Sequence, residues 1–123
     1  RHPVKAVAQR AIRISPGTTL REASRIMVVN GAQEALVDGK PHGVVNLGDI
    51  TRAVAEGKTD LRVMDIMNPG FLTISSDAPL FQAAKMLGRT GAKQLVVHDN
   101  GMPWGFITPR NLMGFLAPAS IFS

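Results

Sequence analysis

The sequence predicts an α/β (α+β) fold made of two similar βαββα repeats packed about a pseudo-twofold axis. Its 123 residues suffice for one compact domain and are too few for a two-domain enzyme. Hydrophobic residues make up 45% of the chain and charged residues 19%, so a core is expected to form. The strongest observation is an internal repeat with a period of about 60 residues.

The repeat appears when the sequence is shifted along itself. A shift of 60 aligns Ile14-Ser15 with Ile74-Ser75, Leu20 with Leu80, Ala23 with Ala83, Gly31-Ala32 with Gly91-Ala92, and Val37 with Val97. A shift of 62 then aligns Pro41 with Pro103, Gly43 with Gly105, and Ala55 with Ala117. Two copies are too few for a solenoid and predict a pair of lobes. We assign residues 1–62 to the first repeat with an N-terminal segment, 63–70 to a linker, and 71–123 to the second repeat.

Each repeat opens with a strand and a helix. The strands are expected at 11–14 and 71–74, each closed by a turn of small and polar residues. Thr18 or Thr19 can cap the first helix, and Ala78-Pro79 begins the second. Gly31 and Gly91 stand where these helices end and a left-handed residue is needed.

Each repeat closes with two strands and a second helix. The strands are expected at 34–37 and 43–47, and again at 94–97 and 105–108; the closing helices are expected at 48–56 and 109–116. A short helix stopped by Pro69 is expected between the repeats. The predicted core comprises Ile14, Leu20, Ile26, Val37, Val45, Ile74, Leu80, Met86, Val97 and Ile107.

Two segments carry a resemblance to a known family. These are Val63-Met64-Asp65-Ile66-Met67, which leads into Ile74-Ser75, and Gly43-Val44-Val45-Asn46-Leu47-Gly48-Asp49-Ile50. Together with the repeated unit, they resemble the cystathionine β-synthase (CBS) domain pair from about residue 11 to residue 116. The resemblance implies a regulatory module whose two lobes leave two clefts, often filled by an adenosine compound. It also implies that two pairs associate as a flat dimer.

The main candidate cleft centres on Asp49. This residue lies in the first turn of the closing helix, where the helix dipole favours a carboxylate, and its two oxygens can accept both hydrogens of a ribose diol. On spacing alone, an acid that merely steadies the helix is an equal alternative. The resemblance implies that Asn46 lies near the base and sugar, that adenine lies near Phe71 and Leu72, and that Lys93 and Arg110 face the phosphates. The alternative for Lys93 and Arg110 is that they are ordinary solvated charges with no ligand.

The second cleft is expected to be weaker. By the same resemblance it contains Ala11 and Ile12 along the base, with Thr108 and Asn111 at the sugar. Asn111 replaces the acid, so any hydrogen bond that it accepts lacks charge assistance. The corresponding phosphate positions are Gln33 and Gly48, beside Glu34, and offer less positive charge. We therefore expect one good nucleotide site and one poor or empty site.

No enzyme, metal site or cofactor is expected from the remaining residues. The chain has no cysteine, which removes thiolate chemistry and fits a cytoplasmic protein. Its three histidines are scattered and match no zinc motif, and its serines lack a nearby histidine base. No charge-free stretch is long enough to span a bilayer.

Composition and charge leave three functional classes. The formal net charge of +5 predicts attraction to anions. The leading interpretation is a regulatory, energy-sensing module that binds AMP, or also ADP or ATP, and controls an effector on another chain. A nucleic-acid binder is the second, because the first 25 residues contain six cations and only one acid, Glu22. The third is a dimerisation scaffold with vestigial clefts.

A homodimer is also expected, with the adaptable side chains of Met27, Met64, Met86 and Met113 at its surface. Trp104 is expected either at this dimer contact or in the packing of its own lobe. These two locations for Trp104 are equally compatible with the sequence.

Overall fold

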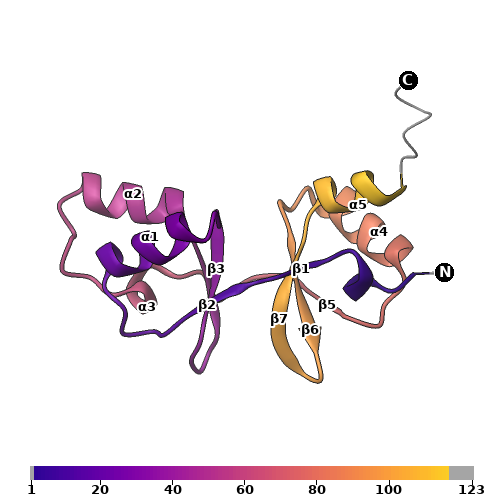
Figure 1. Ribbon diagram of the computed structural model, residues 1–123, viewed down its shortest axis with the longest axis horizontal. Helices are drawn as coiled ribbons and strands as arrows, with labels where there is room; N and C mark the ends of the chain where they lie inside the picture. Colours follow the sequence, from indigo (N-terminus) through magenta and orange to yellow (C-terminus); the bar gives the residue numbers. More distant parts are fainter. Residues whose placement is uncertain (1, 117–123) are drawn as a thin grey trace. The chain divides into compact units, whose positions relative to one another are not determined.

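A computed structural model describes residues 2–116 and divides the chain into two compact units (Figure 1). The first-repeat unit comprises residues 11–71. The second-repeat unit comprises residues 2–10 and 72–116 among those described. The compact units therefore differ from the sequence repeats: the N-terminal segment packs with the second repeat, and the segment 63–70 packs with the first.

The first-repeat unit has a mixed three-stranded sheet with helices beside it. Its elements are β2 (Ile12–Ile14), α1 (Leu20–Val29), β3 (Glu34–Val37), β4 (Gly43–Asn46), α2 (Leu47–Ala55) and α3 (Val63–Ile66). The strand order is β2-β3-β4, in which β2 and β3 run parallel and β3 and β4 antiparallel. The core joins strand residues such as Ala35 and Val37 to Leu20 and Met27 of α1 and Val63 of α3.

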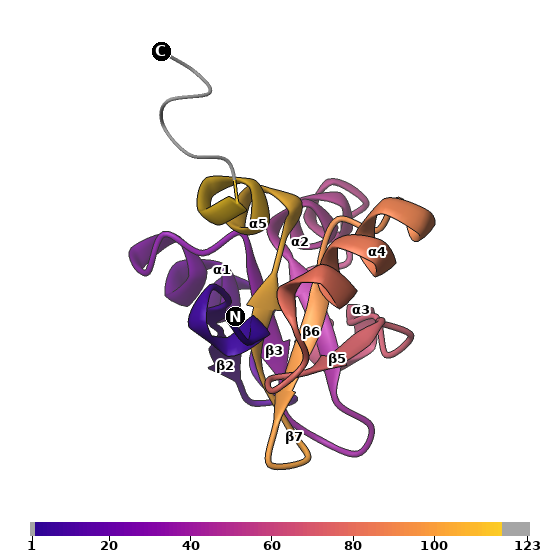
Figure 2. The same ribbon diagram turned by 90° about the vertical axis from the view of Figure 1, so that its right-hand side faces the viewer.

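The second-repeat unit repeats this plan and adds a strand. Its elements are the 3₁₀ helix η1 (Val4–Ala6), β1 (Gln9–Arg10), β5 (Thr73–Ser75), α4 (Leu80–Thr90), β6 (Leu95–Asp99), β7 (Met102–Ile107) and α5 (Pro109–Leu116). The strand order is β1-β7-β6-β5, with β5 and β6 parallel and the other pairs antiparallel. Helices α4 and α5 lie together beside this sheet (Figure 2).

The N-terminal segment is an integral part of the second-repeat unit. Val4 is fully buried in its core, and the Val4 N–H donates to the carbonyl of Ala78 at 2.8 Å. β1 then pairs with β7, where Gly105 lies opposite Arg10. A side chain at Gly105 would collide with the Gln9 carbonyl, so glycine is required for this close approach. The sequence predicted neither η1 nor β1.

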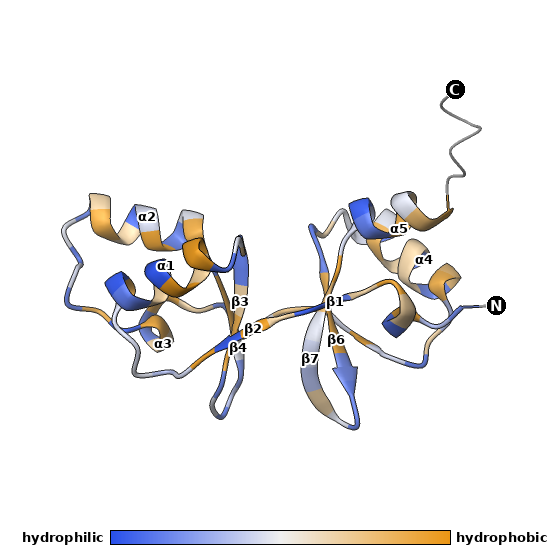
Figure 3. Ribbon diagram, viewed as in Figure 1, coloured by the Kyte–Doolittle hydropathy of each residue, from blue (hydrophilic) through white to orange (hydrophobic). Residues whose placement is uncertain are grey.

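The two repeats agree residue by residue in their burial. Residues 20–40 and 80–100 have the same order of buried, half-buried and exposed positions throughout. Figure 3 shows the corresponding alternation of hydrophobic and hydrophilic residues along the helices of each unit. Gly31 and Gly91 both have positive φ, at 64° and 69°, as the helix-end prediction requires. The predicted α/β repeat is therefore confirmed.

The predicted core is confirmed except at two positions. Ile26 and Met86 are half-buried, because each lies at the margin of the helix face that covers its sheet. The other eight predicted core residues are buried. Met27 is fully buried, so its assignment to a dimer surface was wrong. Trp104 packs against the core of its own unit, with the Lys5 ammonium 5.3 Å from its ring centroid.

Candidate functional site

The junction of β4 and α2 holds the main ribose candidate. Asn46 adopts an extended backbone at the end of β4, and its side-chain oxygen accepts a hydrogen bond from the Asp49 N–H at 2.8 Å. This bond caps the helix and fixes the position of Asp49 in the first turn. Both side chains are half-buried, so each presents polar atoms to solvent from a defined backbone.

The Asp49 carboxylate is only partly engaged within its unit. One of its oxygens accepts a bond from Arg52 at 3.2 Å, and the other accepts none from the described residues. The Arg52 side chain is 68% exposed, so this ion pair is a weak one that a ligand can displace at small cost. Asp49 therefore retains acceptor capacity for two hydroxyl groups.

The matching junction of the second repeat is tied together differently. The Thr108 N–H donates to the Asn111 side-chain oxygen at 3.0 Å, and the Asn111 N–H donates to the Thr108 hydroxyl at 3.1 Å. These two reciprocal hydrogen bonds form a capping box at the N-terminal end of α5. The Asn111 side-chain oxygen therefore already accepts a hydrogen bond from the Thr108 backbone N–H, whereas the Asp49 carboxylate accepts only from the Arg52 side chain among the described residues.

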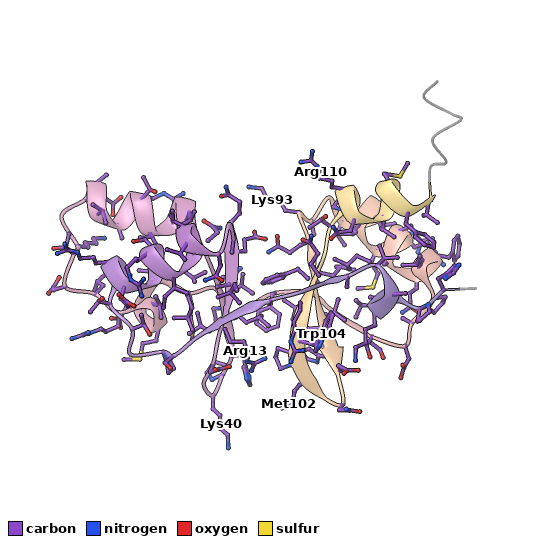
Figure 4. All side chains as sticks on the ribbon, viewed as in Figure 1. Arg13, Lys40, Lys93, Met102, Trp104 and Arg110 are labelled. Atoms are coloured by element: carbon purple, nitrogen blue, oxygen red, sulfur yellow. The ribbon has the colours of Figure 1, made fainter. Side chains whose placement is uncertain are left out.

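The two phosphate candidates lie at one end of the second-repeat unit. Lys93 precedes β6 and Arg110 lies in the first turn of α5, directly after β7. The antiparallel register pairs Leu95 with Ile107, which brings these flanking segments to the same end of the sheet (Figure 4). Both side chains are exposed, and neither forms an ion pair within the part of the chain that the structure describes.

The candidate base-lining residues divide between the units. Phe71 belongs to the first-repeat unit and is half-buried, whereas Leu72 belongs to the second-repeat unit and is 42% exposed. Ala11 and Ile12 are half-buried in the first-repeat unit, where Ile12 packs against the core. Both predicted clefts thus combine residues of two compact units, and the clefts themselves stay a prediction.

Several cations near the N-terminus are bound internally. Lys5 pairs with Asp99 at 2.7 Å, Arg13 with Asp38 at 2.6 Å, and Arg25 with Glu22 at 2.6 Å. These pairs are distributed over both units. The N-terminal cations that suggested nucleic acid thus belong to two units, and Lys5, Arg13 and Arg25 are each paired with an acid.

Asp99 is the centre of a polar cluster that sequence reasoning missed. Its carboxylate accepts from the Lys5 ammonium and, at 2.7 Å, from the buried Ser76 hydroxyl. The hydrogen bonds from Lys5 and Ser76 lower the pKa of this carboxyl below its usual value. The three residues are remote in sequence, so no local pattern could have shown the cluster.

Residues 2–116 contain neither a cluster of metal ligands nor a membrane-spanning helix. No group of three or more histidine, cysteine, aspartate or glutamate side chains is arranged to hold a metal ion there. Within the same residues, no helix has the length and apolar character that crossing a membrane requires.

Comparison with known proteins identifies both repeats. The family model of the CBS domain matches residues 4–56 and again residues 63–118. An uncharacterized protein from Methanocaldococcus jannaschii is 29% identical over 109 residues. The match covers 85% of this chain, which spans only 36% of the length of that relative.

Solved structures share the fold across almost the whole chain. The crystal structure of CBSX2 in complex with AMP has a TM-score of 0.78 and 23% identity, with all of both chains covered. An uncharacterized conserved protein from Pyrococcus horikoshii has a TM-score of 0.77 and 22% identity, covering 95% of this chain and 93% of its own. CBSX2 from Arabidopsis thaliana has a TM-score of 0.74 and 21% identity, covering 98% and 95%.

Proposed function

Because the chain belongs to the CBS domain family and contains two CBS domains, we propose that it is a regulatory module that binds an adenine nucleotide, AMP in the first place and also ADP or ATP. A structural neighbour, CBSX2, was crystallised in complex with AMP, and this supports the ligand class. The observation that carries the proposal is the Asp49 carboxylate, fixed on a capped first turn with unused acceptor capacity.

We propose that the nucleotide lies in a cleft between the two repeats. Asp49 accepts the ribose hydroxyls, Asn46 lies near the base and sugar, and Phe71 and Leu72 line adenine. Lys93 and Arg110 contact the phosphate. Their exposure at one end of the second-repeat unit, without acidic partners among the described residues, supports this role because the charges remain available to an anion.

The second cleft, with Ala11, Ile12, Thr108 and Asn111, is proposed to bind poorly. Asn111 carries no charge, and its oxygen already accepts from the Thr108 N–H. A ribose hydroxyl that used this oxygen would have to compete with the cap of α5. The proposal thus predicts one nucleotide per chain at concentrations that saturate the first cleft.

Calorimetric titration with AMP tests the assignment. Asp49→Ala is expected to weaken AMP by about 1.5 to 3 kcal/mol, the usual contribution of hydrogen bonds to a charged group, which is at least about tenfold in affinity. Asn111→Ala, the matched control in the other repeat, should leave the affinity unchanged. If Asn111→Ala abolishes binding and Asp49→Ala is silent, the two clefts are assigned in reverse.

The phosphate contact has its own test. Arg110→Ala should weaken AMP but leave adenosine almost unaffected, because only the phosphate interacts with that charge. Added salt should narrow the difference between the two ligands, since exposed charges are screened. If no adenine nucleotide binds the wild-type chain at millimolar concentration, nucleotide sensing is the wrong function, and a dimerisation scaffold or a nucleic-acid binder takes its place.

We further propose that the module works as a homodimer and acts on an effector carried by another chain or segment. The exposure of Met64 and Met113, at 49% and 56%, supports their proposed place at an interface. No reaction is assigned to the chain.

A further inference from the structure

The dipeptide Asn-Gly occurs twice in this chain, at Asn30-Gly31 and at Asn100-Gly101. Asparagine followed by glycine is prone to deamidation, because no side chain shields the glycine nitrogen from the amide carbon of the asparagine. The two dipeptides are chemically identical. Any difference in their reactivity in the folded chain therefore comes from the structure around them.

Asn30-Gly31 is held by the end of α1. Asn30 is the C-terminal cap of this helix, and its side-chain amide donates to the Ile26 carbonyl at 2.7 Å. The Gly31 N–H donates to the Val28 carbonyl at 3.1 Å. The nitrogen that would attack and the amide group that would leave are thus both bound to the last turn of the helix. Reaction at Asn30 must first break these two hydrogen bonds.

Asn100-Gly101 is the two-residue turn that joins β6 to β7. Asp99 pairs with Met102 across the base of this turn. Asn100 and Gly101 both have positive φ, at 52° and 77°, as a type I′ turn requires. Asn100 is exposed, and neither its side chain nor the Gly101 N–H forms a hydrogen bond with any part of residues 2–116. Both reacting groups are therefore free of the bonds that hold Asn30 and Gly31.

Ring closure at Asn100 needs only a local opening of the hairpin end. The Gly101 nitrogen reaches the Asn100 side-chain carbon after rotation about the bond between Cα and the carbonyl carbon of Asn100. This rotation moves Gly101 and separates the terminal pair, Asp99 with Met102. A terminal pair at an exposed turn opens at a lower free energy than the interior of a sheet does. The turn can therefore reach the reactive geometry while the rest of the unit stays folded.

We propose that Asn100 is a site of spontaneous deamidation and that the fold protects Asn30 from the same reaction. The Gly101 nitrogen forms a bond to the side-chain amide carbon of Asn100. The bond from that carbon to the amide nitrogen breaks, and ammonia leaves with the Gly101 proton. Water then adds to either carbonyl of the succinimide ring and opens it. The product is aspartate or isoaspartate at position 100, and water is the only co-reactant.

Deamidation changes the charge beside the Asp99 cluster. The formal net charge of +5 falls by one, because a neutral amide becomes a carboxylate. The new carboxylate directly follows Asp99, whose two oxygens already accept from Lys5 and Ser76 at 2.7 Å. Isoaspartate also lengthens the main chain within the two-residue turn that sets the register of β6 and β7. The modification therefore acts next to the contact that holds the N-terminal segment to the second-repeat unit.

The turn is remote from the proposed phosphate contacts. Met102, next to the turn, lies at the opposite end of the second-repeat unit from Lys93 and Arg110 (Figure 4). The inference is therefore independent of nucleotide binding. Its test uses the wild-type chain without a ligand.

Peptide mapping of the folded wild-type chain at mildly alkaline pH tests the proposal. Trypsin cleaves after Lys and Arg except before Pro, so Asn30-Gly31 falls in the fragment 26–52 and Asn100-Gly101 in the fragment 94–110. Mass spectrometry with fragmentation locates the mass increase of the amide-to-acid conversion. It should accumulate at Asn100 at least about fourfold faster than at Asn30, because each hydrogen bond that must break first slows the reaction by roughly two- to tenfold.

Incubation in concentrated urea is the control for the effect of the fold. Both asparagines should then react at similar rates, because the hydrogen bonds that protect Asn30 are absent from the unfolded chain. Asn100→Gln is the matched variant, since glutamine must close a larger ring that forms more slowly. The fragment 94–110 of this variant should keep its mass under the conditions that convert the wild-type chain.

Three results would overturn the proposal. The first is a rate at Asn30 in the folded chain that equals or exceeds the rate at Asn100. The second is a folded chain whose fragment 94–110 keeps its mass while the urea sample is converted, because the turn then protects Asn100 as well. The third is a mass increase in the fragment 94–110 of Asn100→Gln as fast as in wild type, because the reaction then occurs at another residue.

Discussion

At the scale of single residues, the two repeats differ most where their closing helices begin. Asn46 caps α2 and leaves the Asp49 carboxylate available, whereas Thr108 and Asn111 cap each other at the start of α5. An amide in place of the acid removes the charge of the site and leaves its side-chain oxygen less available to accept a further hydrogen bond. The family resemblance implies two clefts; the uncharged Asn111 already favours one good site over the other, and these local bonds support that expectation.

Asp99 provides a residue-scale prediction about pH. Its pKa is lowered by hydrogen bonds from Lys5 and Ser76, so the folded state holds the ionised form more strongly than the unfolded state does. A lowered pKa contributes stability at neutral pH that declines as the pH falls toward the usual value of 3.8. This contribution disappears once the pH is below the still lower pKa of the folded state.

Asp99→Asn should therefore lower the melting temperature at pH 7, and its difference from wild type should shrink on acidification. The amide oxygen can still accept a hydrogen bond from Ser76, so the variant removes the charge but keeps this hydrogen bond. Asp77→Asn, at an exposed acid without an ion pair among the described residues, should change neither quantity. If the melting temperatures of Asp99→Asn and wild type differ by the same amount at pH 7 and at pH 2, the Asp99 charge contributes nothing to stability.

At the scale of elements, the spacing of apolar residues and the residues that cap each end account for the helices. α1 begins at a Thr19 cap, whose hydroxyl accepts from the Glu22 N–H at 3.1 Å, and Gly31 follows its last turn with positive φ. In α4, the residues Leu80, Ala83 and Leu87 recur at helical spacing and are all buried. Burial of this stripe against the sheet stabilises the helix more than its intrinsic propensity does.

Leu80→Ala tests that stripe. Leu80 is 5% exposed, and its truncation should reduce the free energy of unfolding by about 2 to 5 kcal/mol through lost burial and a residual cavity. Denaturant titration measures the change. Phe81→Ala, at the adjacent and exposed position, should reduce stability by far less when measured at concentrations where the chain is monomeric. Similar losses for both variants would show that α4 is not packed through this face.

At the scale of the whole molecule, chain order and structural units do not coincide. The first ten residues supply η1 and β1 to the unit that otherwise begins at residue 72. Lys5 bonds to Asp99, which lies 94 positions further along the chain. The beginning of the chain is therefore a structural part of the second repeat.

Val4→Ala tests whether the N-terminal segment stabilises the second-repeat unit. Val4 is fully buried in the second-repeat core, so its truncation should cost about 1 to 3 kcal/mol there. Hydrogen exchange should show faster exchange of amides in β6 and β7, with β3 and β4 unchanged. Val28→Ala, at an exposed position of the other unit, should leave both sets unchanged. Destabilisation confined to β3 and β4 would contradict the assignment of the N-terminal segment.

The sequence by itself determined the features that depend on neighbours along the chain. The repeat, the strand and helix order, a threonine cap at residue 18 or 19, the glycine helix ends and most of the core could be predicted from residue spacing, because local geometry imposes a period on the residues. The same reasoning put Asn46 at the end of a strand and Asp49 in the first turn of the following helix, as the structure has them, whereas their contacts with a nucleotide come from the family resemblance and stay a proposal.

Only the tertiary structure decided the features that depend on distant segments. The packing of residues 2–10 in the second-repeat unit, the need for glycine at 105 beside Gln9, and the Lys5, Ser76 and Asp99 cluster have no local signature. The physical reason is that such contacts arise from the folded path of the chain, which brings together residues that no periodic pattern connects.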